Sequence, residues 1–186
     1  MDPASSSSTS SSSSLPSGAI IAYPVRFQAG DDLVSSIEDY VRSIHDHHPS
    51  ENASAAAFVL SAVGSLEHVT LRMANAGQNT DGTMTTTNAI KTWHERLEIL
   101  SLNGTVSRDG KHLHMSVSDQ HGTVYGGHVI AGTIFTTLEL VLGVLPTVSF
   151  ARRQDPRTGF PELVVEPHHL KPNANADGAG GTSQSK

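Results

Sequence analysis

The stretch GKHLHMSVSDQHGTVYGGHVI, residues 110–130, carries four of the eleven histidines of this 186-residue chain. Its composition predicts two strands joined by a turn. Side chains at positions i and i+2 of a strand point to one face, so His112 and His114 are expected about 6.5–7 Å apart on the same side. The pair alone also fits a solvent-facing strand that carries no chemistry, and that interpretation stays open.

The turn between the two strands decides whether a third histidine joins this pair. The segment DQHGT, residues 119–123, has glycine where a three-residue hairpin loop places its left-handed residue. Asp119 then pairs with Thr123, and His114 lies directly opposite His128. Opposed Cβ atoms are about 4.5–5.5 Å apart and diagonal neighbours about 7–8 Å. Three imidazoles are therefore expected to converge on one patch.

Two features of the same segment allow the alternative, in which His128 does not join His112 and His114. A two-residue turn would shift the register by one residue and send His128 to the other face. Gly126 and Gly127 could add a bulge that changes the direction of the second strand. The predicted convergence of the three rings therefore depends on Gly122 closing a three-residue loop. His121, at the loop tip, is interpreted as a hydrated turn residue.

Three neutral imidazoles bind a divalent ion at about 2.0–2.1 Å, and a three-histidine set with an open fourth position is typical of catalytic zinc sites. The expected cofactor is a divalent metal ion, with zinc as the first choice and nickel, cobalt or iron as alternatives. The sequence offers no certain general base, so whether the chain is an enzyme stays open.

The segments around this stretch predict an α+β domain with a mostly antiparallel sheet of about seven strands and one or two helices. Asp31 or Asp32 is expected to cap a helix that Pro49 bars from continuing. Residues 55–74 are expected to form two extended segments with a break near Gly64 and Ser65. The other strands are expected at residues 19–27, 96–102 and 138–150.

Both ends of the chain have a different composition from the middle. Residues 1–18 are rich in serine, and residues 166–186 are rich in glycine, alanine and asparagine towards the end. Such segments bury too little apolar surface to offset the entropy of ordering them. We expect two disordered tails around a domain at residues 19–165.

Charge and composition exclude several classes of protein. The formal net charge is −6, and the twelve basic residues are scattered, with Arg152 and Arg153 as the one adjacent pair. A nucleic-acid interface needs a basic face, so direct DNA binding is not expected. Cysteine is absent, which excludes disulfides and thiolate metal sites. No apolar run reaches the roughly 20 residues of a membrane helix, so no membrane association is expected.

The N-terminal residues lack the basic start and apolar middle of a secretory signal. A serine-rich transit peptide is the alternative, although no arginine precedes Arg26. The expected location is the nucleus or the cytoplasm, with import into an organelle left open.

Several segments together resemble the PPC domain, the plants-and-prokaryotes-conserved domain, over about residues 20–153. The similar segments are 27–41, 56–72, 96–107, 110–133 and 138–145. The resemblance implies an antiparallel sheet flanked by helices, assembled as a trimer. It also implies that His112, His114 and His128 form a metal-binding unit of the kind found in prokaryote-type members, without His121.

The resemblance also suggests partner roles for two arginines. Plant members usually carry an AT-hook, which is not found in this sequence, and a partner-contact stretch similar to ERLEIL, residues 95–100, which contains Arg96. Glu95 and Leu97 depart from that stretch. Arg72 matches a position that is commonly arginine in the family and is a candidate for anion contact near the metal; a surface arginine is the alternative.

Three functions remain after this comparison. The first is a homotrimeric metal-binding module for assembly or regulation. The second is a transcription-associated module that forms hetero-oligomers with AT-hook-bearing PPC relatives and reaches DNA through them. The third is a metal-dependent hydrolase or lyase. Similarity of fold cannot choose among them.

Overall fold

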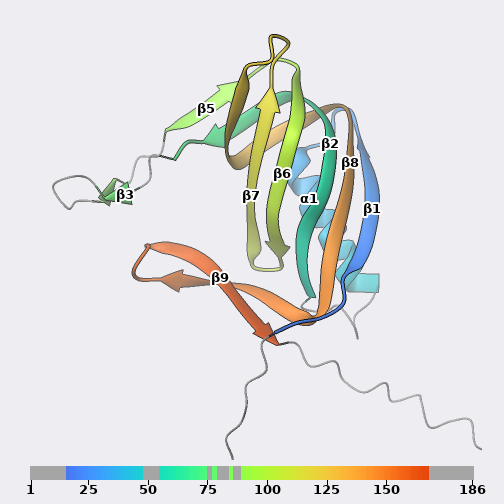
Figure 1. Ribbon diagram of the computed structural model, residues 1–186, viewed down its shortest axis with the longest axis vertical. Helices are drawn as coiled ribbons and strands as arrows, with labels where there is room; N and C mark the ends of the chain where they lie inside the picture. The colour runs from blue at the N-terminus through green and yellow to red at the C-terminus, as the bar shows by residue number, and fades with distance from the viewer. Residues whose placement is uncertain (1–15, 48–54, 75–76, 79–83, 86–88, 168–186) are drawn as a thin grey trace, which may run out of the picture.

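The computed structural model describes residues 16–47, 55–74, 77–78, 84–85 and 89–167. Figure 1 shows its elements, which follow the chain as β1 (Ile21–Gln28), α1 (Leu33–His47), β2 (Ala55–Arg72), β3 (Gly77–Gln78), β4 (Met84–Thr85), β5 (Ile90–Trp93), β6 (Leu97–Ser107), β7 (Gly110–Ser118), β8 (Val124–Asp155) and β9 (Phe160–Pro167). Strand β9 extends two residues past the expected domain boundary at 165. The rest of the two expected tails lies outside the described residues, apart from residues 16–18.

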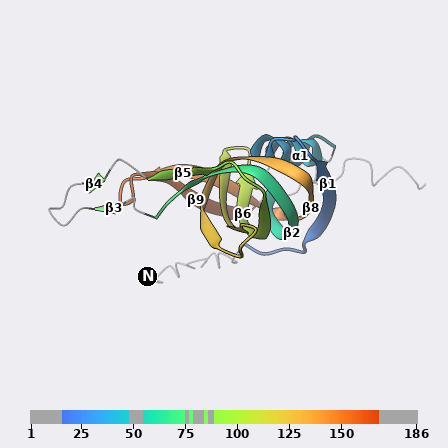
Figure 2. The same ribbon diagram turned by 90° about the horizontal axis from the view of Figure 1, so that it is seen from above.

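The main sheet has seven strands in the order β1-β8-β7-β6-β2-β5, and β9 pairs with β8. Every described strand pairing is antiparallel. Strand β8 also pairs directly with β2, so β2, β6, β7 and β8 form a closed ring. With the helix α1 on one side of this ring (Figures 1 and 2), the prediction of an α+β fold with a mostly antiparallel sheet is confirmed. The described residues contain one helix, and it is not long and apolar enough to span a membrane.

The longest strand, β8, is one continuous strand of 32 residues, although the sequence predicted separate strands here. It can stay continuous because successive parts of it pair with β7, β2, β1 and β9. Strand β2 is also continuous, and the predicted break near Gly64 and Ser65 is wrong. Register shifts, one of them between Gly64 and Leu66, replace the break, because a bulge absorbs an irregular residue without ending the strand.

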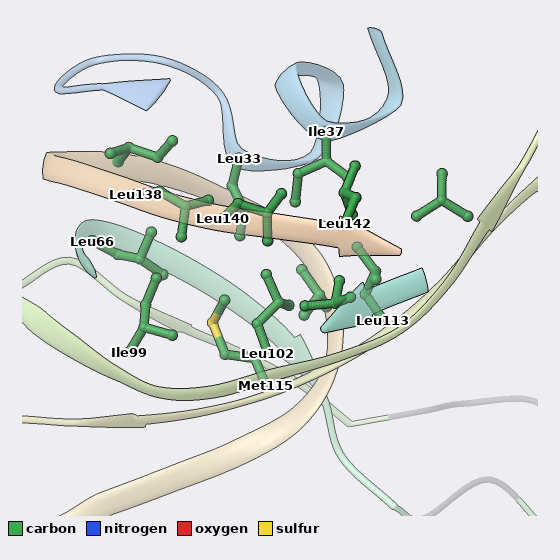
Figure 3. Packing of buried hydrophobic residues seen from close by; sticks show 14 of the residues in the cluster. Leu33, Ile37, Leu66, Ile99, Leu102, Leu113, Met115, Leu138, Leu140 and Leu142 are labelled. Atoms are coloured by element: carbon green, nitrogen blue, oxygen red, sulfur yellow. The ribbon is translucent and has the colours of Figure 1, made fainter. Parts of the chain in front are cut away.

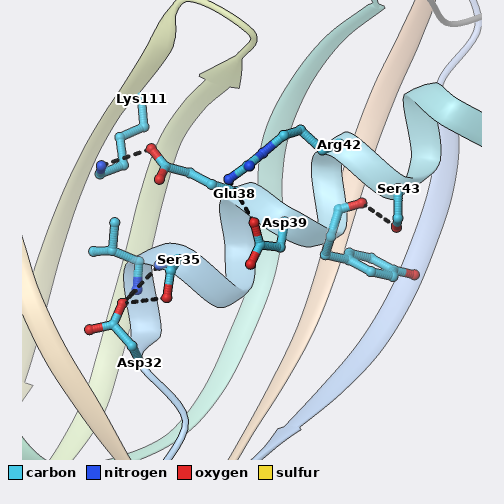
Figure 4. A network of polar contacts seen from close by, with 9 residues as sticks. Asp32, Ser35, Glu38, Asp39, Arg42, Ser43 and Lys111 are labelled. Atoms are coloured by element: carbon cyan, nitrogen blue, oxygen red, sulfur yellow. Dashed lines mark hydrogen bonds and ion pairs between the residues drawn. The ribbon is translucent and has the colours of Figure 1, made fainter.

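Helix α1 begins at the predicted cap. The carboxylate Oδ1 of Asp32 accepts hydrogen bonds from Val34 N at 3.1 Å and from Ser35 N at 2.8 Å (Figure 4). The bond from Ser35 N is the largest cause that lowers the pKa of Asp32 below its ordinary value. Glu38 on the same helix forms an ion pair with Lys111 of β7 at 2.8 Å, which ties the helix to the histidine strand.

The core lies between α1 and the strands of the ring. Leu33 and Ile37 of the helix pack over Leu140 and Leu142 of β8 in Figure 3, and all four side chains are buried. Strand β7 alternates cleanly: its inward residues are Leu113, Met115 and Val117. The residues between them point away from the core, so His112 and His114 lie on the outer face of the ring.

Candidate metal centre

The turn between β7 and β8 is a three-residue loop, as the sequence predicted. Asp119 N donates to Thr123 O at 3.1 Å, and Gly122 N donates to Asp119 O at 3.0 Å. Gly122 has a φ of 78°, in the left-handed region that glycine adopts without strain. The carboxylate of Asp119 also accepts a hydrogen bond from His121 N at 2.8 Å. These bonds close the loop and fix the register of both strands.

The register places His114 directly opposite His128, with no shift between Asp119 and that pair. Gly126 and Gly127 pair in regular order with β7, so the alternative of a bulge at these glycines is wrong. The ring centroids of His112, His114 and His128 are 5.0, 5.1 and 5.5 Å apart. The predicted convergence of the three imidazoles is therefore confirmed, and it rests on the local chemistry of a glycine-closed loop.

The distances between nitrogens suit a divalent ion. His112 Nε2 and His114 Nε2 are 3.0 Å apart. Nitrogens bound to one ion at about 2.1 Å stand about 3.0–3.4 Å apart. One candidate nitrogen from each of the three rings lies within 4.8 Å of the other two, which leaves a modest closing movement for the third ring. Among all histidine, aspartate and glutamate side chains of the described residues, these three histidines are the group of three or more whose ligand atoms lie close enough together to share one metal ion.

Burial favours the metal-binding form of two of these rings. Burial lowers the pKa of His128 to about 4, and the charge of Arg72 acts in the same direction. Burial, followed by the charge of His114, lowers the pKa of His112. A neutral imidazole is the ligand form, so His112 and His128 are ready to bind an ion at neutral pH without first losing a proton.

One atom of the cluster also lacks a partner. His128 Nδ1 is buried, and no described residue gives it a hydrogen bond. Leaving such a nitrogen unsatisfied costs about 1–3 kcal/mol. A bond from this nitrogen to an ion would remove that cost. The donor set and its environment therefore fit a divalent metal with affinity for imidazole.

A pocket of about 380 Å³ opens beside the cluster. It is lined by Asn103, Gly104, Thr105, His112, His114, Arg152, Glu162 and Leu163. Arg152 and Glu162 were missed in the sequence, because they come from the β8–β9 hairpin and residues 160–167 were not recognised as a strand. The apolar run at residues 163–165, between Glu162 and Glu166, was the available signal. That pattern does not say which strand residues 160–167 would pair with.

The two arginines with predicted partner roles have different positions. Arg72 pairs in register with His128, and its guanidinium lies 5.9 Å from the centre of the Phe160 ring. Arg96 lies over the ring of Phe135 at 4.2 Å, a cation–π contact, and does not line the pocket. The structure thus brings Arg72 to the cluster and leaves Arg96 outside it. Their contacts with an anion or a partner stay predictions.

The fold and the cluster define a class: an α+β protein that displays three converging histidines on the outer face of an antiparallel sheet. A family model described as the Plants and Prokaryotes Conserved (PCC) domain matches residues 16–146. The chain therefore belongs to the PCC domain family, also abbreviated PPC, and the resemblance seen in the sequence is confirmed.

Solved structures agree with this family. A hypothetical protein from Salmonella cholerae-suis is 30% identical, with a TM-score of 0.70 over 82% of this chain and 98% of that one. A plant- and prokaryote-conserved (PPC) protein from Pyrococcus horikoshii is 20% identical, with a TM-score of 0.60 over 81% and 97%. A protein from Archaeoglobus fulgidus, described as metal-containing, is 24% identical with a TM-score of 0.60 over 81% and 99%. Because the Pyrococcus horikoshii and Archaeoglobus fulgidus proteins have such low sequence identity, their similarity to this chain shows a shared fold alone.

The curated relatives are much longer proteins. Two proteins named bifunctional protein GlmU, from two Synechococcus strains, are 40% identical over 154 and 153 residues. The match covers 82% of this chain but 21% and 22% of those proteins. The chain thus spans about a fifth of the length of the curated relatives that it matches. What the match shows is a shared domain.

Proposed function

We propose that this chain is a metal-binding assembly module in which His112, His114 and His128 hold one divalent ion, zinc first. The observation that carries the proposal is the convergence of three ligand nitrogens within 4.8 Å from two paired strands. The description of the Archaeoglobus fulgidus neighbour as metal-containing agrees with it. A bound zinc ion with an open position would act as a Lewis acid towards an oxygen ligand.

The chain's own residues have separate tasks in this site. Strand β7 supplies two ligands from one face, and the loop at Gly122 sets the register that brings the third. Burial keeps His128 neutral, so no proton competes for its ring at pH 7. The ion pair between Lys111 and Glu38 holds the start of the histidine strand against α1.

Purified protein is expected to contain about one zinc per chain by elemental analysis after passage over a weak chelator. The double variant His112→Ala, His114→Ala removes two of three ligands and is expected to contain less than a tenth of that amount, since one imidazole cannot retain the ion. His121→Ala is the matched control, because this histidine lies at the loop tip outside the cluster. A wild-type protein without metal after incubation with zinc would contradict the proposal.

The assembly is a homotrimer in this proposal, as the family resemblance implies. Strand β9 pairs with β8 on one side and is otherwise an edge strand. Leu163 and Val165 share one face of it and are 38% and 44% exposed. An edge strand with exposed apolar residues is prone to pair with another chain, so it offers a contact surface between subunits.

Light scattering after size exclusion is expected to give the mass of three 19.6 kDa chains. Replacing both Leu163 and Val165 by lysine would place charges in the proposed contact, and the mass is expected to fall to that of one chain. The control is Gln154→Lys, an exposed polar residue of the same hairpin. A wild-type monomer that is stable across a hundredfold range of concentration would rule the trimer out.

A further inference from the structure

The pocket beside the three histidines joins residues that are far apart in sequence. Strand β6 contributes Thr105, β7 contributes His112 and His114, and the β8–β9 hairpin contributes Arg152 and Glu162. Figure 1 shows this hairpin folded back near the lower end of β7. The pocket therefore has the candidate metal ligands on one wall and a cation and a carboxylate on another.

Arg152 is fixed in place but keeps its charge unpaired. Its Nη2 donates to Thr105 Oγ1 at 2.7 Å, which holds the guanidinium against the pocket wall. No carboxylate among the described residues forms an ion pair with it. Its neighbour Arg153, in contrast, is paired with Glu166 at 2.8 Å. A partly buried cation without an anion is costly, so it is available to a ligand of opposite charge.

Other charges near the cluster favour an anion as well. Arg72 pairs in register with His128, and Arg152 lines the pocket together with His112 and His114. Among the described residues, Glu162 is the one carboxylate that lines the pocket, and its Oε1 accepts a hydrogen bond from Thr158 Oγ1 at 2.9 Å. A bound divalent ion would add two further positive charges. The pocket of the loaded protein is thus positive, with a single negative group.

We propose that this pocket binds a small monocarboxylate, with the carboxylate held between Arg152 and the open position of the metal ion. The inference rests on the proposed metal site, because the ion supplies one of the two contacts. Guanidinium and carboxylate form strong charge-assisted hydrogen bonds. Glu162 faces the same space and suits a donor group on the ligand, such as a hydroxyl.

The class of anion follows from the same residues. Phosphate has polar oxygens on every side, so it would leave the apolar side of the pocket at Leu163 without a matching contact. Leu163 gives the pocket an apolar side that suits a short carbon chain. A volume of about 380 Å³ has room for a small molecule. A short organic acid is therefore the ligand that fits.

The test uses the full chain loaded with cobalt(II), whose visible absorption reports changes in coordination. Sodium acetate is titrated at constant pH and ionic strength into the wild type, Arg152→Gln and Arg153→Gln, after cobalt content is measured for each. Acetate is expected to change the cobalt spectrum of the wild type. Its dissociation constant is expected to rise about tenfold in Arg152→Gln, because a charged hydrogen bond is lost, and by less than twofold in Arg153→Gln.

The possible results distinguish a failure of this inference from a failure of the proposed metal site. A wild-type protein that takes up no cobalt would remove the metal site and the inference together. Normal cobalt content with equal acetate affinity in the wild type and Arg152→Gln would overturn the inference alone. A parallel titration with sodium phosphate is expected to give weaker binding than acetate. Tighter phosphate binding would overturn the assignment to carboxylates.

Discussion

Replacing Gly104 with alanine is expected to lower the free energy of unfolding by about 3–5 kcal/mol. Gly104 has a φ of 140°, which side chains rarely adopt, and a Cβ there would lie 1.9 Å from the carbonyl oxygen of His112. The oxygen belongs to the backbone of the neighbouring strand, so the clash is relieved only by separating β6 from β7. The measurement is urea unfolding at a fixed protein concentration, since assembly would make stability depend on concentration.

Gly110→Ala is the matched control for this variant. Gly110 has a φ of 127° in the same pair of strands, but a Cβ there meets no atom within 4 Å. It should cost about 1–2 kcal/mol for the backbone conformation alone. The difference between the two variants isolates the steric clash. If both destabilise the protein equally, the close approach of Gly104 to His112 does not limit stability.

Truncating Leu113 to alanine is expected to lower the free energy of unfolding by about 2–5 kcal/mol. Leu113 is 0% exposed and lies between His112 and His114, on the face of β7 opposite to theirs. It anchors the strand in the core, and this burial keeps the two histidines facing outwards. Loss of its methyl groups leaves a cavity that close-packed neighbours can fill only in part.

The control for this prediction is Leu100→Ala on the adjacent strand β6. Leu100 is 54% exposed, so its truncation is expected to change the free energy of unfolding by less than about 0.5 kcal/mol. Both variants are compared by urea unfolding at the same concentration. A cost at Leu100 as large as that at Leu113 would contradict the assignment of the inner and outer faces of the sheet.

The helix and the histidine hairpin could be predicted from the sequence because both depend on local chemistry. Asp32 caps a helix within three residues of itself, and Gly122 closes a loop between strands that are neighbours in the chain. Strand alternation then places every second side chain on the same face. The position of His128 beside His114 follows from these short-range rules.

The course of the long strands could not be predicted in the same way. An apolar alternation predicts a strand but does not say which distant strands it joins. Strand β8 pairs with the distant strands β1 and β2 as well as with its chain neighbours β7 and β9. The predicted break near Gly64 was wrong for the same reason: a glycine can mark a bulge or a strand end, and pairing with β8 decides which. The β8–β9 hairpin was likewise not recognised.

The sequence by itself determined the mostly antiparallel α+β class, the capped helix and the meeting of three imidazoles, because each depends on the steric preferences of a few consecutive residues. Only the tertiary structure decided what lies beside those rings. Arg152 reaches Thr105 across 47 positions of sequence. Such a contact forms only when the whole sheet buries its apolar face, and the free energy of that burial is shared by residues along the entire domain.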